Sequence, residues 1–132
     1  MEQPLRPRPS RYVVMVIDVP AATVAPVAPQ LRAAGYETLV ARNVFEALEL
    51  LRRGCLPHVM LLEAVRLSRG VETFLEICAA TPSLSRIPRI LVMGSAVDAD
   101  GAEKRCGATS VLYRPVPWSL LFEMVILNGP AR

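Results

Sequence analysis

Apolar runs alternate with amphipathic segments along most of this chain. The first run, 12–17 (YVVMVI), is continuous and rich in β-branched residues, which is typical of a strand covered on both faces. Shorter apolar runs follow at 36–41, 59–63, 89–93 and 109–113. We therefore predict five strands, each separated from the next by enough residues for a helix.

The segment after the second run carries the clearest helix signals. Asn43 can cap a helix, Glu46 can reach back to complete a capping box, and Gly54 can end the helix. Four apolar residues then fall on one face at helical spacing: Val44, Ala47, Leu48 and Leu51.

Four further helices are expected at about 26–34, 71–80, 98–106 and 117–127. The first begins near Pro26, because a proline inside a helix removes a backbone donor and clashes with the preceding turn. Strands that alternate with helices predict an α/β fold, in which right-handed crossovers place helices on both faces of a parallel sheet.

Composition refines this picture mainly at the amino terminus. The 132 residues suit one domain, and the net charge of +3 includes +2 from the first eleven residues, where three arginines oppose one glutamate. We expect residues 1–10 (MEQPLRPRPS) to form a flexible tail and 11–128 to form the domain. The nearly neutral domain makes a nucleic-acid partner unlikely on charge grounds, and a role for the tail in such binding is the weakest hypothesis.

Localisation follows from what the chain lacks and from its cysteines. No apolar run approaches the roughly 20 residues of a membrane span, so we expect no membrane partner. The amino terminus has no secretory signal pattern, and Cys55, Cys78 and Cys106 are odd in number and widely spaced. These features favour a reducing cytoplasm and buried thiols.

Polar residues gather where the predicted strands end. Asp18, Glu63, Ser95 and Arg114 follow the first, third, fourth and fifth strands. The carboxyl ends of parallel strands form the functional crevice of such a sheet, so we expect these side chains to converge there.

Five segments at this spacing resemble the receiver domain of bacterial two-component response regulators over about residues 12–127. They are VVMVIDVP, LRAAGYETLVARNVFEALELL, PHVMLLE, SLSRIPRILV and GATSVLYRPV. The resemblance implies a flavodoxin-like doubly wound sheet with strand order 2-1-3-4-5. It also implies a function in signal transduction, in which an aspartate accepts a phosphoryl group with the help of Mg²⁺.

This chain departs from the residues that the resemblance implies for that chemistry. The acidic pair after the first strand is reduced to Ile17-Asp18, the acceptor aspartate is replaced by Glu63, and the lysine before Pro115 is replaced by Arg114. Losing an oxygen ligand weakens a Mg²⁺ site, and the extra methylene of glutamate moves the nucleophile by about an ångström. We expect no cofactor, no metal beyond weak binding at Asp18, and no enzyme activity.

Several roles at this site stay open. Ser95 takes the position of the family's switch Ser/Thr only if the fourth helix is about three residues shorter than usual, because counting places that position near Met93 or Val92. The switch aromatic position holds Val111, and Tyr113 is expected on the other face of the strand.

Purely structural roles are alternatives to functional roles for these polar residues. A Glu63–Arg114 bidentate pair is expected either to be structural or to mimic a permanently activated site. Asp18 serves the turn before Pro20 more readily than a cation. His58, which has no second ligand at metal spacing, is expected to be a solvated or hydrogen-bonded loop histidine.

The carboxyl-terminal segment PVPWSLLFEMVIL suggests a partner surface. Four residues are assigned to the core: Val116, Leu120, Val125 and Leu127. The expected surface comprises Val111, Tyr113, Trp118, Leu121 and Phe122, on the face formed by the fourth helix, fifth strand and fifth helix. Its partner would be a signalling protein or a second copy of the chain in a homodimer.

We predict a receiver-like domain that does not accept phosphate and acts as a protein–protein interaction module. The alternative is an atypical receiver that still accepts a phosphoryl group with Mg²⁺ through Asp18 and Glu63. The sequence leaves open whether the domain acts alone or belongs to a longer protein with an output domain.

Overall fold

The computed structural model describes residues 12–18, 27–64, 68–94, 107–114 and 116–127, leaving out the side chains of Asp18, Val27 and Trp118. Its five strands are β1 (Val13–Asp18), β2 (Glu37–Ala41), β3 (Val59–Glu63), β4 (Arg89–Met93) and β5 (Ser110–Tyr113). They form one parallel sheet in the order β2-β1-β3-β4-β5. The predicted fold class, strand order and strands are confirmed.

Five helices connect or follow these strands in the described residues. They are α1 (Val27–Ala33), α2 (Val44–Arg52), α3 (Arg69–Ala80), α4 (Pro82–Ser85) and α5 (Trp118–Leu127). The short α4 was not predicted; it begins with Pro82, whose fixed φ suits the first turn of a helix. The helix expected at 98–106 lies outside the described residues.

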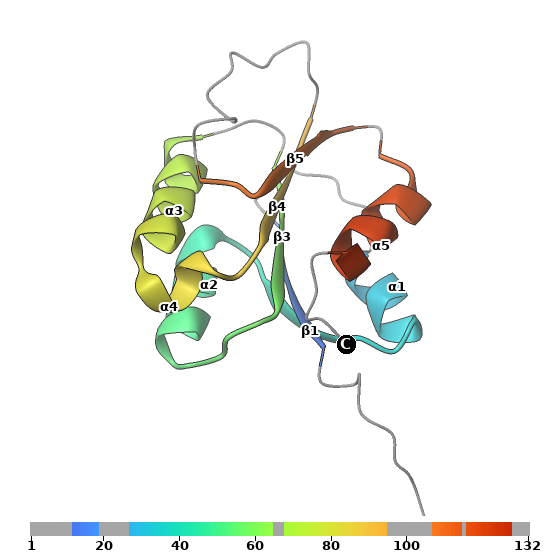
Figure 1. Ribbon diagram of the computed structural model, residues 1–132, viewed down its shortest axis with the longest axis horizontal. Helices are drawn as coiled ribbons and strands as arrows, with labels where there is room; N and C mark the ends of the chain where they lie inside the picture. Colours follow the sequence, from blue (N-terminus) through green and yellow to red (C-terminus); the bar gives the residue numbers. More distant parts are fainter. Residues whose placement is uncertain (1–11, 19–26, 65–67, 95–106, 115, 128–132) are drawn as a thin grey trace, which may run out of the picture.

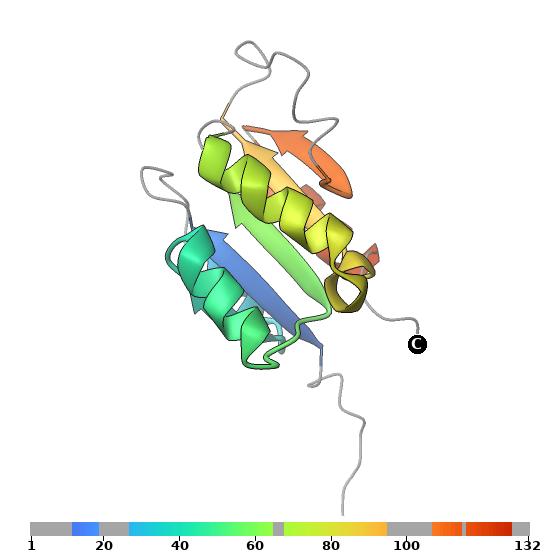
Figure 2. The same ribbon diagram turned by 90° about the vertical axis from the view of Figure 1, so that its left-hand side faces the viewer.

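The helices lie on both faces of the sheet. Helices α2, α3 and α4 cover one face, here the α2/α3 face, and α1 and α5 cover the other, here the α1/α5 face (Figure 1). Seen from the α2/α3 side, α2 and α3 lie next to each other across the strands (Figure 2). Side chains of β1, β3 and β4 alternate between two separate cores, as expected for strands buried on both sides.

The residues predicted to begin and end α2 make nearly the contacts expected of them. Asn43 Oδ1 accepts a hydrogen bond of 2.8 Å from the backbone N–H of Glu46. Glu46 Oε1 accepts one of 2.7 Å from the N–H of Arg42 rather than of Asn43, so the side chain reaches back one residue further than expected. Gly54 has φ +91°, which allows it to end the helix.

Arg89 is a buried cation that sequence reasoning did not single out, and it stabilises the turn before β5. Its residue exposure is 8%, and its guanidinium donates to the carbonyls of Gly107 (2.7 Å), Ile87 (2.7 Å), Leu84 (3.2 Å) and Ser85 (3.4 Å). Two of these carbonyls belong to the last turn of α4, where helical partners are lacking. A single side chain therefore joins α4, β4 and the start of β5.

No helix among the described residues is long and apolar enough to span a membrane.

Candidate functional site

Glu63 lies at the carboxyl end of β3, in the middle of the sheet. It is paired in register with Asp18 of β1 on one side and Val92 of β4 on the other. All five residues of β3 are buried, and Glu63 has an exposure of only 3%. A carboxylate this deeply placed requires a compensating partner, because removing a charge from water costs several kcal/mol.

Arg114 supplies that partner. Its backbone N–H donates to the carbonyl of Met93 at 3.0 Å, which places its side chain just past the end of β5. Nη2 of Arg114 lies 3.6 Å from Oε2 of Glu63, and the arginine side chain is 24% exposed. The predicted ion pair is present, although its one recorded contact is longer than a hydrogen bond and does not make the expected bidentate fork.

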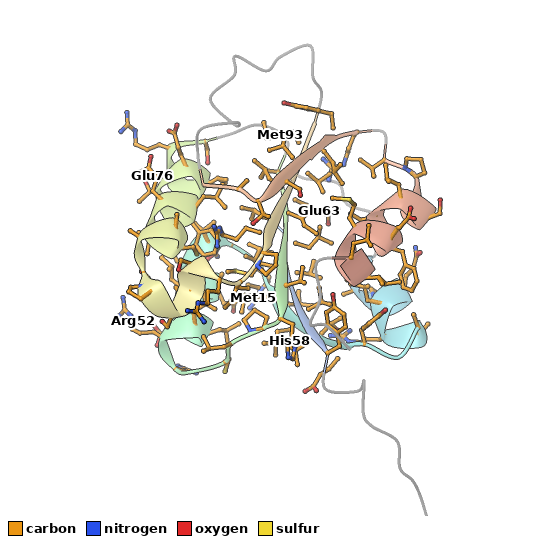
Figure 3. All side chains as sticks on the ribbon, in the orientation of Figure 1. Met15, Arg52, His58, Glu63, Glu76 and Met93 are labelled. Atoms are coloured by element: carbon orange, nitrogen blue, oxygen red, sulfur yellow. The ribbon has the colours of Figure 1, made fainter. Side chains whose placement is uncertain are left out.

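The two side chains reach each other because of the two-residue period of the strands. Glu63 continues the series Val59 and Leu61, which faces the α1/α5 core, and Arg114 continues the series that includes Leu112 on the same face. Figure 3 shows Glu63 near the end of the sheet at which the strands finish. The pair thus joins β3 to β5 across the intervening strand β4.

Ile17 lies on the opposite face from this pair. It is fully buried in the α2/α3 core and is paired in register with Leu62. The structure therefore does not bring Ile17 together with Glu63 and Arg114, and its side chain is part of the core packing.

Three other positions of the expected site lie wholly or partly outside the described residues. The backbone of Asp18 is beside Glu63 in the sheet, but its side chain lies outside the described residues. Ser95 and Pro115 also lie outside them. Met93 and Val92, the two alternatives for the switch position, end β4 as buried apolar residues on opposite faces.

The expectation that Tyr113 faces away from Val111 is wrong. Both are half-buried and pack against the α2/α3 core. Residues two apart on a strand share a face, which places Tyr113 on the same side of β5 as Val111. An aromatic ring is therefore present on the face of Val111, two residues further along β5.

The structure also corrects which residues of α5 are buried. Leu121, expected on the surface, is only 5% exposed and packs in the α1/α5 core with Val125, four residues on. Leu120 and Leu127, expected in the core, are exposed, the latter to 72%. The core set proposed from sequence did not follow the three- and four-residue spacing of a helix face.

Phe122 is not a free aromatic anchor either, because its ring packs edge-on against Tyr36 with centroids 5.7 Å apart. The side chain of Trp118 lies outside the described residues. Among the described side chains of α5, three apolar ones are exposed and are hereafter called the α5 apolar surface: Leu120, Ile126 and Leu127.

A second polar cluster, around His58, lies at the amino-terminal end of the sheet, far from Glu63 (Figure 3). The predicted hydrogen-bonded loop histidine is confirmed, since His58 Nδ1 accepts from the N–H of Val13 at 2.9 Å. The ring of Tyr12 contacts those of His58 and Tyr36, and its hydroxyl donates to the carbonyl of Val125 in α5. Burial, with a smaller contribution from Tyr36, raises the pKa of Tyr12 to about 12.

The described side chains around Glu63 form no cluster of metal ligands. Within the described residues, no three His, Cys, Asp or Glu side chains come close enough together to hold a metal ion. Glu63 faces a permanent cation in Arg114, and the isoleucine beside Asp18 belongs to the core. The Glu63–Arg114 pair therefore neutralises one buried carboxylate within the chain.

Comparison with solved structures gives the fold a family context. The chain matches the receiver domain of a signal transduction histidine kinase from Syntrophus aciditrophicus, with TM-score 0.71, 20% identity and 88% of each chain covered. It matches a response regulator receiver domain protein from Methanospirillum hungatei with TM-score 0.72 and 19% identity, covering 88% of this chain and 91% of that one. A response regulator protein from Burkholderia multivorans matches with TM-score 0.66 and 22% identity, covering 91% and 97%.

The chain therefore has the fold of response regulator receiver domains. No protein-family model matches the sequence, and no curated protein matches it.

Proposed function

We propose that this chain is a signalling module with a receiver fold that does not accept a phosphoryl group and works by binding another protein. The observation that carries the proposal is the Glu63–Arg114 pair. The carboxylate at the end of β3 is 3% exposed and already neutralised by a cation of the same chain. A nucleophile held in this way is shielded from a phosphoryl donor and from a metal ion.

Two further features support the loss of phosphotransfer. Glutamate is one methylene longer than aspartate, which displaces the attacking oxygen by about an ångström from the position used by an aspartate. The side chain of Ile17 lies in the α2/α3 core and offers no oxygen to a metal ion. The Glu63–Arg114 pair would then hold β5 in one arrangement at all times, as a permanently activated site would.

The α5 apolar surface is the proposed contact region for the partner. Leu120, Ile126 and Leu127 are exposed on a ten-residue helix whose described exposed side chains include one charge, that of Glu123. Exposed apolar residues grouped on one helix are typical of a surface that binds a protein. We place the module in the cytoplasm, because Cys55 and Cys78 are free thiols in a chain with three cysteines.

The test of phosphotransfer is incubation with Mg²⁺ and acetyl phosphate followed by intact-mass spectrometry. We expect no phosphoryl adduct on the native chain. Glu63→Gln is the matched control, because it retains the size of the side chain and removes the nucleophile. An adduct on the native chain that is lost in Glu63→Gln would overturn the proposal and establish the alternative, an atypical receiver that still accepts phosphate.

The test of binding is site-specific photocrosslinking in cells, with the crosslinking residue at position 127 and, as control, at Phe45. Phe45 is exposed to a similar degree but lies on α2, on the other side of the sheet. We expect protein adducts from position 127 and few from position 45. An adduct of twice the chain mass would identify the partner as a second copy of the chain, and equal labelling at both positions would contradict the assigned surface.

A further inference from the structure

His58 connects the start of β1 to the start of β3 through two hydrogen bonds with the same residue. Its backbone N–H donates to the carbonyl of Val13 at 2.8 Å, and its Nδ1 accepts from the N–H of Val13 at 2.9 Å. The register of the two strands begins one residue later, with Val14 opposite Val59. The imidazole therefore adds one hydrogen bond to the β1–β3 ladder. Its Nδ1 accepts from the N–H of Val13, as a backbone carbonyl of the neighbouring strand would in a longer ladder.

This contact requires a neutral imidazole with its proton on Nε2. A backbone N–H can only donate, so the ring nitrogen that faces it must carry a lone pair. Protonation of Nδ1 would set one N–H group against another and would break the bond. Because only the neutral imidazole can accept this hydrogen bond, the contribution of His58 to the β1–β3 contact depends on pH.

The same ring is linked to α5 through Tyr12. The rings of His58 and Tyr12 meet edge-on with centroids 5.7 Å apart, and the Tyr12 hydroxyl donates to the carbonyl of Val125. Tyr12 in turn contacts Tyr36, which contacts Phe122 of α5. Loosening the start of β1 would therefore be transmitted to the carboxyl-terminal half of α5.

Among the described residues, the titratable side chain in recorded contact with the imidazole is the phenol of Tyr12. Burial raises the pKa of Tyr12 to about 12, so this phenol stays protonated as the pH falls through the acidic range. Among the described residues, no carboxylate, lysine or arginine forms an ion pair with His58. His58 is also the one histidine of the 132 residues.

We propose that His58 is a pH-sensitive lock on the amino-terminal end of the sheet, closed while its imidazole is neutral and opened by protonation of Nδ1. Opening releases the N–H of Val13 and weakens the hold of Tyr12 on α5. This inference rests on the geometry around His58 and is independent of the proposed function.

The test follows the Val13 amide by NMR in the full-length ¹⁵N-labelled chain as the pH falls from about 8 to about 5. We expect the protection of this amide from hydrogen exchange, corrected for the intrinsic pH dependence, to fall roughly five- to tenfold as one hydrogen bond is lost. The amide signal of Val125 should shift along the same titration curve. Long-range imidazole spectra at neutral pH should show the proton on Nε2.

Two variants separate the acceptor from the ring. His58→Asn places an amide oxygen near the position of Nδ1 without a titratable group, so the protection of Val13 should not change with pH. His58→Phe retains the ring without an acceptor, so protection should be low throughout. If His58→Phe does not fold, the comparison of the native chain with His58→Asn still decides.

Equal pH dependence in the native chain and in His58→Asn would overturn the proposal, as would a neutral-pH proton on Nδ1. A titration that moves Val13 and leaves Val125 unchanged would overturn the link to α5.

Discussion

Arg114 Nη2 lies 3.6 Å from Glu63 Oε2, although Glu63 ends β3 and Arg114 directly follows β5, which is not a neighbour of β3 in the sheet. The contact connects the edge strand β5 to the central strand β3 over the end of β4. Because Glu63 is almost fully buried, this contact also stabilises its charge.

Replacing Arg114 by methionine is expected to destabilise the protein by about 1–3 kcal/mol, because it removes a cation from beside a buried carboxylate. The lower part of that range reflects the exposure of the arginine. Urea unfolding measures the change. The double variant Glu63→Gln/Arg114→Met should recover most of the loss, and a double variant as unstable as the sum of both single changes would contradict the coupling.

Arg89→Met is expected to lower the free energy of unfolding by about 3 kcal/mol, because four carbonyl groups lose their charged donor. Arg86, three residues earlier, is exposed, and Arg86→Met serves as the control with an expected change below about 0.5 kcal/mol. Chemical denaturation of both variants measures the difference. Equal stability of the two would show that the buried guanidinium contributes nothing.

Gly107 and Gly54 offer a matched pair of glycines. Both have φ near +90°, but a Cβ at Gly107 would lie 2.9 Å from the carbonyl oxygen of Leu75, whereas nothing lies within 4 Å at Gly54. Gly54→Ala should cost about 1 kcal/mol for its backbone conformation alone. Gly107→Ala should cost clearly more, as measured by thermal unfolding, and equal costs would contradict the steric argument.

Alkaline conditions should weaken the contact of Tyr12 with α5. Burial raises the pKa of this phenol from 10.0 to about 12, so the folded state prefers the protonated donor. The stability that this preference provides is complete below about pH 10, the pKa of an exposed phenol, and is lost as the pH rises toward 12. Unfolding free energies measured across this range should fall less steeply in Tyr12→Phe than in the native chain.

The thiol of Cys78 should resist alkylation in the folded protein. Burial, opposed in part by Arg89, raises the pKa of Cys78 to about 11, and the residue is fully buried. Cys55 is half-buried and should react with iodoacetamide first. Peptide mass spectrometry after brief labelling at pH 8 measures both sites, and labelling of Cys78 at the rate of Cys55 would show that the core opens locally.

The fold could be read from the sequence because its strands are consistently apolar and its helix boundaries carry local signals. The run at 59–63 predicted β3 to the residue, and Asn43 placed the start of α2. The short α4 was missed, because a four-residue helix has too few positions to show a period.

The candidate site was predicted in part. The approach of Arg114 to Glu63 followed from the rule that parallel strands end at one edge of the sheet. The exposure of Leu121 and the burial of Leu127 were predicted wrongly, since the two residues are equally apolar and only the position of the helix on the sheet decides which is buried. The role of Arg89 could not be predicted, because the sequence does not show which backbone carbonyls come together around its guanidinium.

Because the side chains of β3 alternate between two cores, this strand is expected to tolerate substitutions better than insertions or deletions. Leu62 faces the α2/α3 core, while Leu61 and Glu63 face the other side of β3. Deleting one residue from β3 would exchange these faces, which would direct a carboxylate toward hydrocarbon and would separate it from Arg114. Substitutions in this strand are therefore expected to be graded in effect, whereas single-residue insertions and deletions should abolish folding outright.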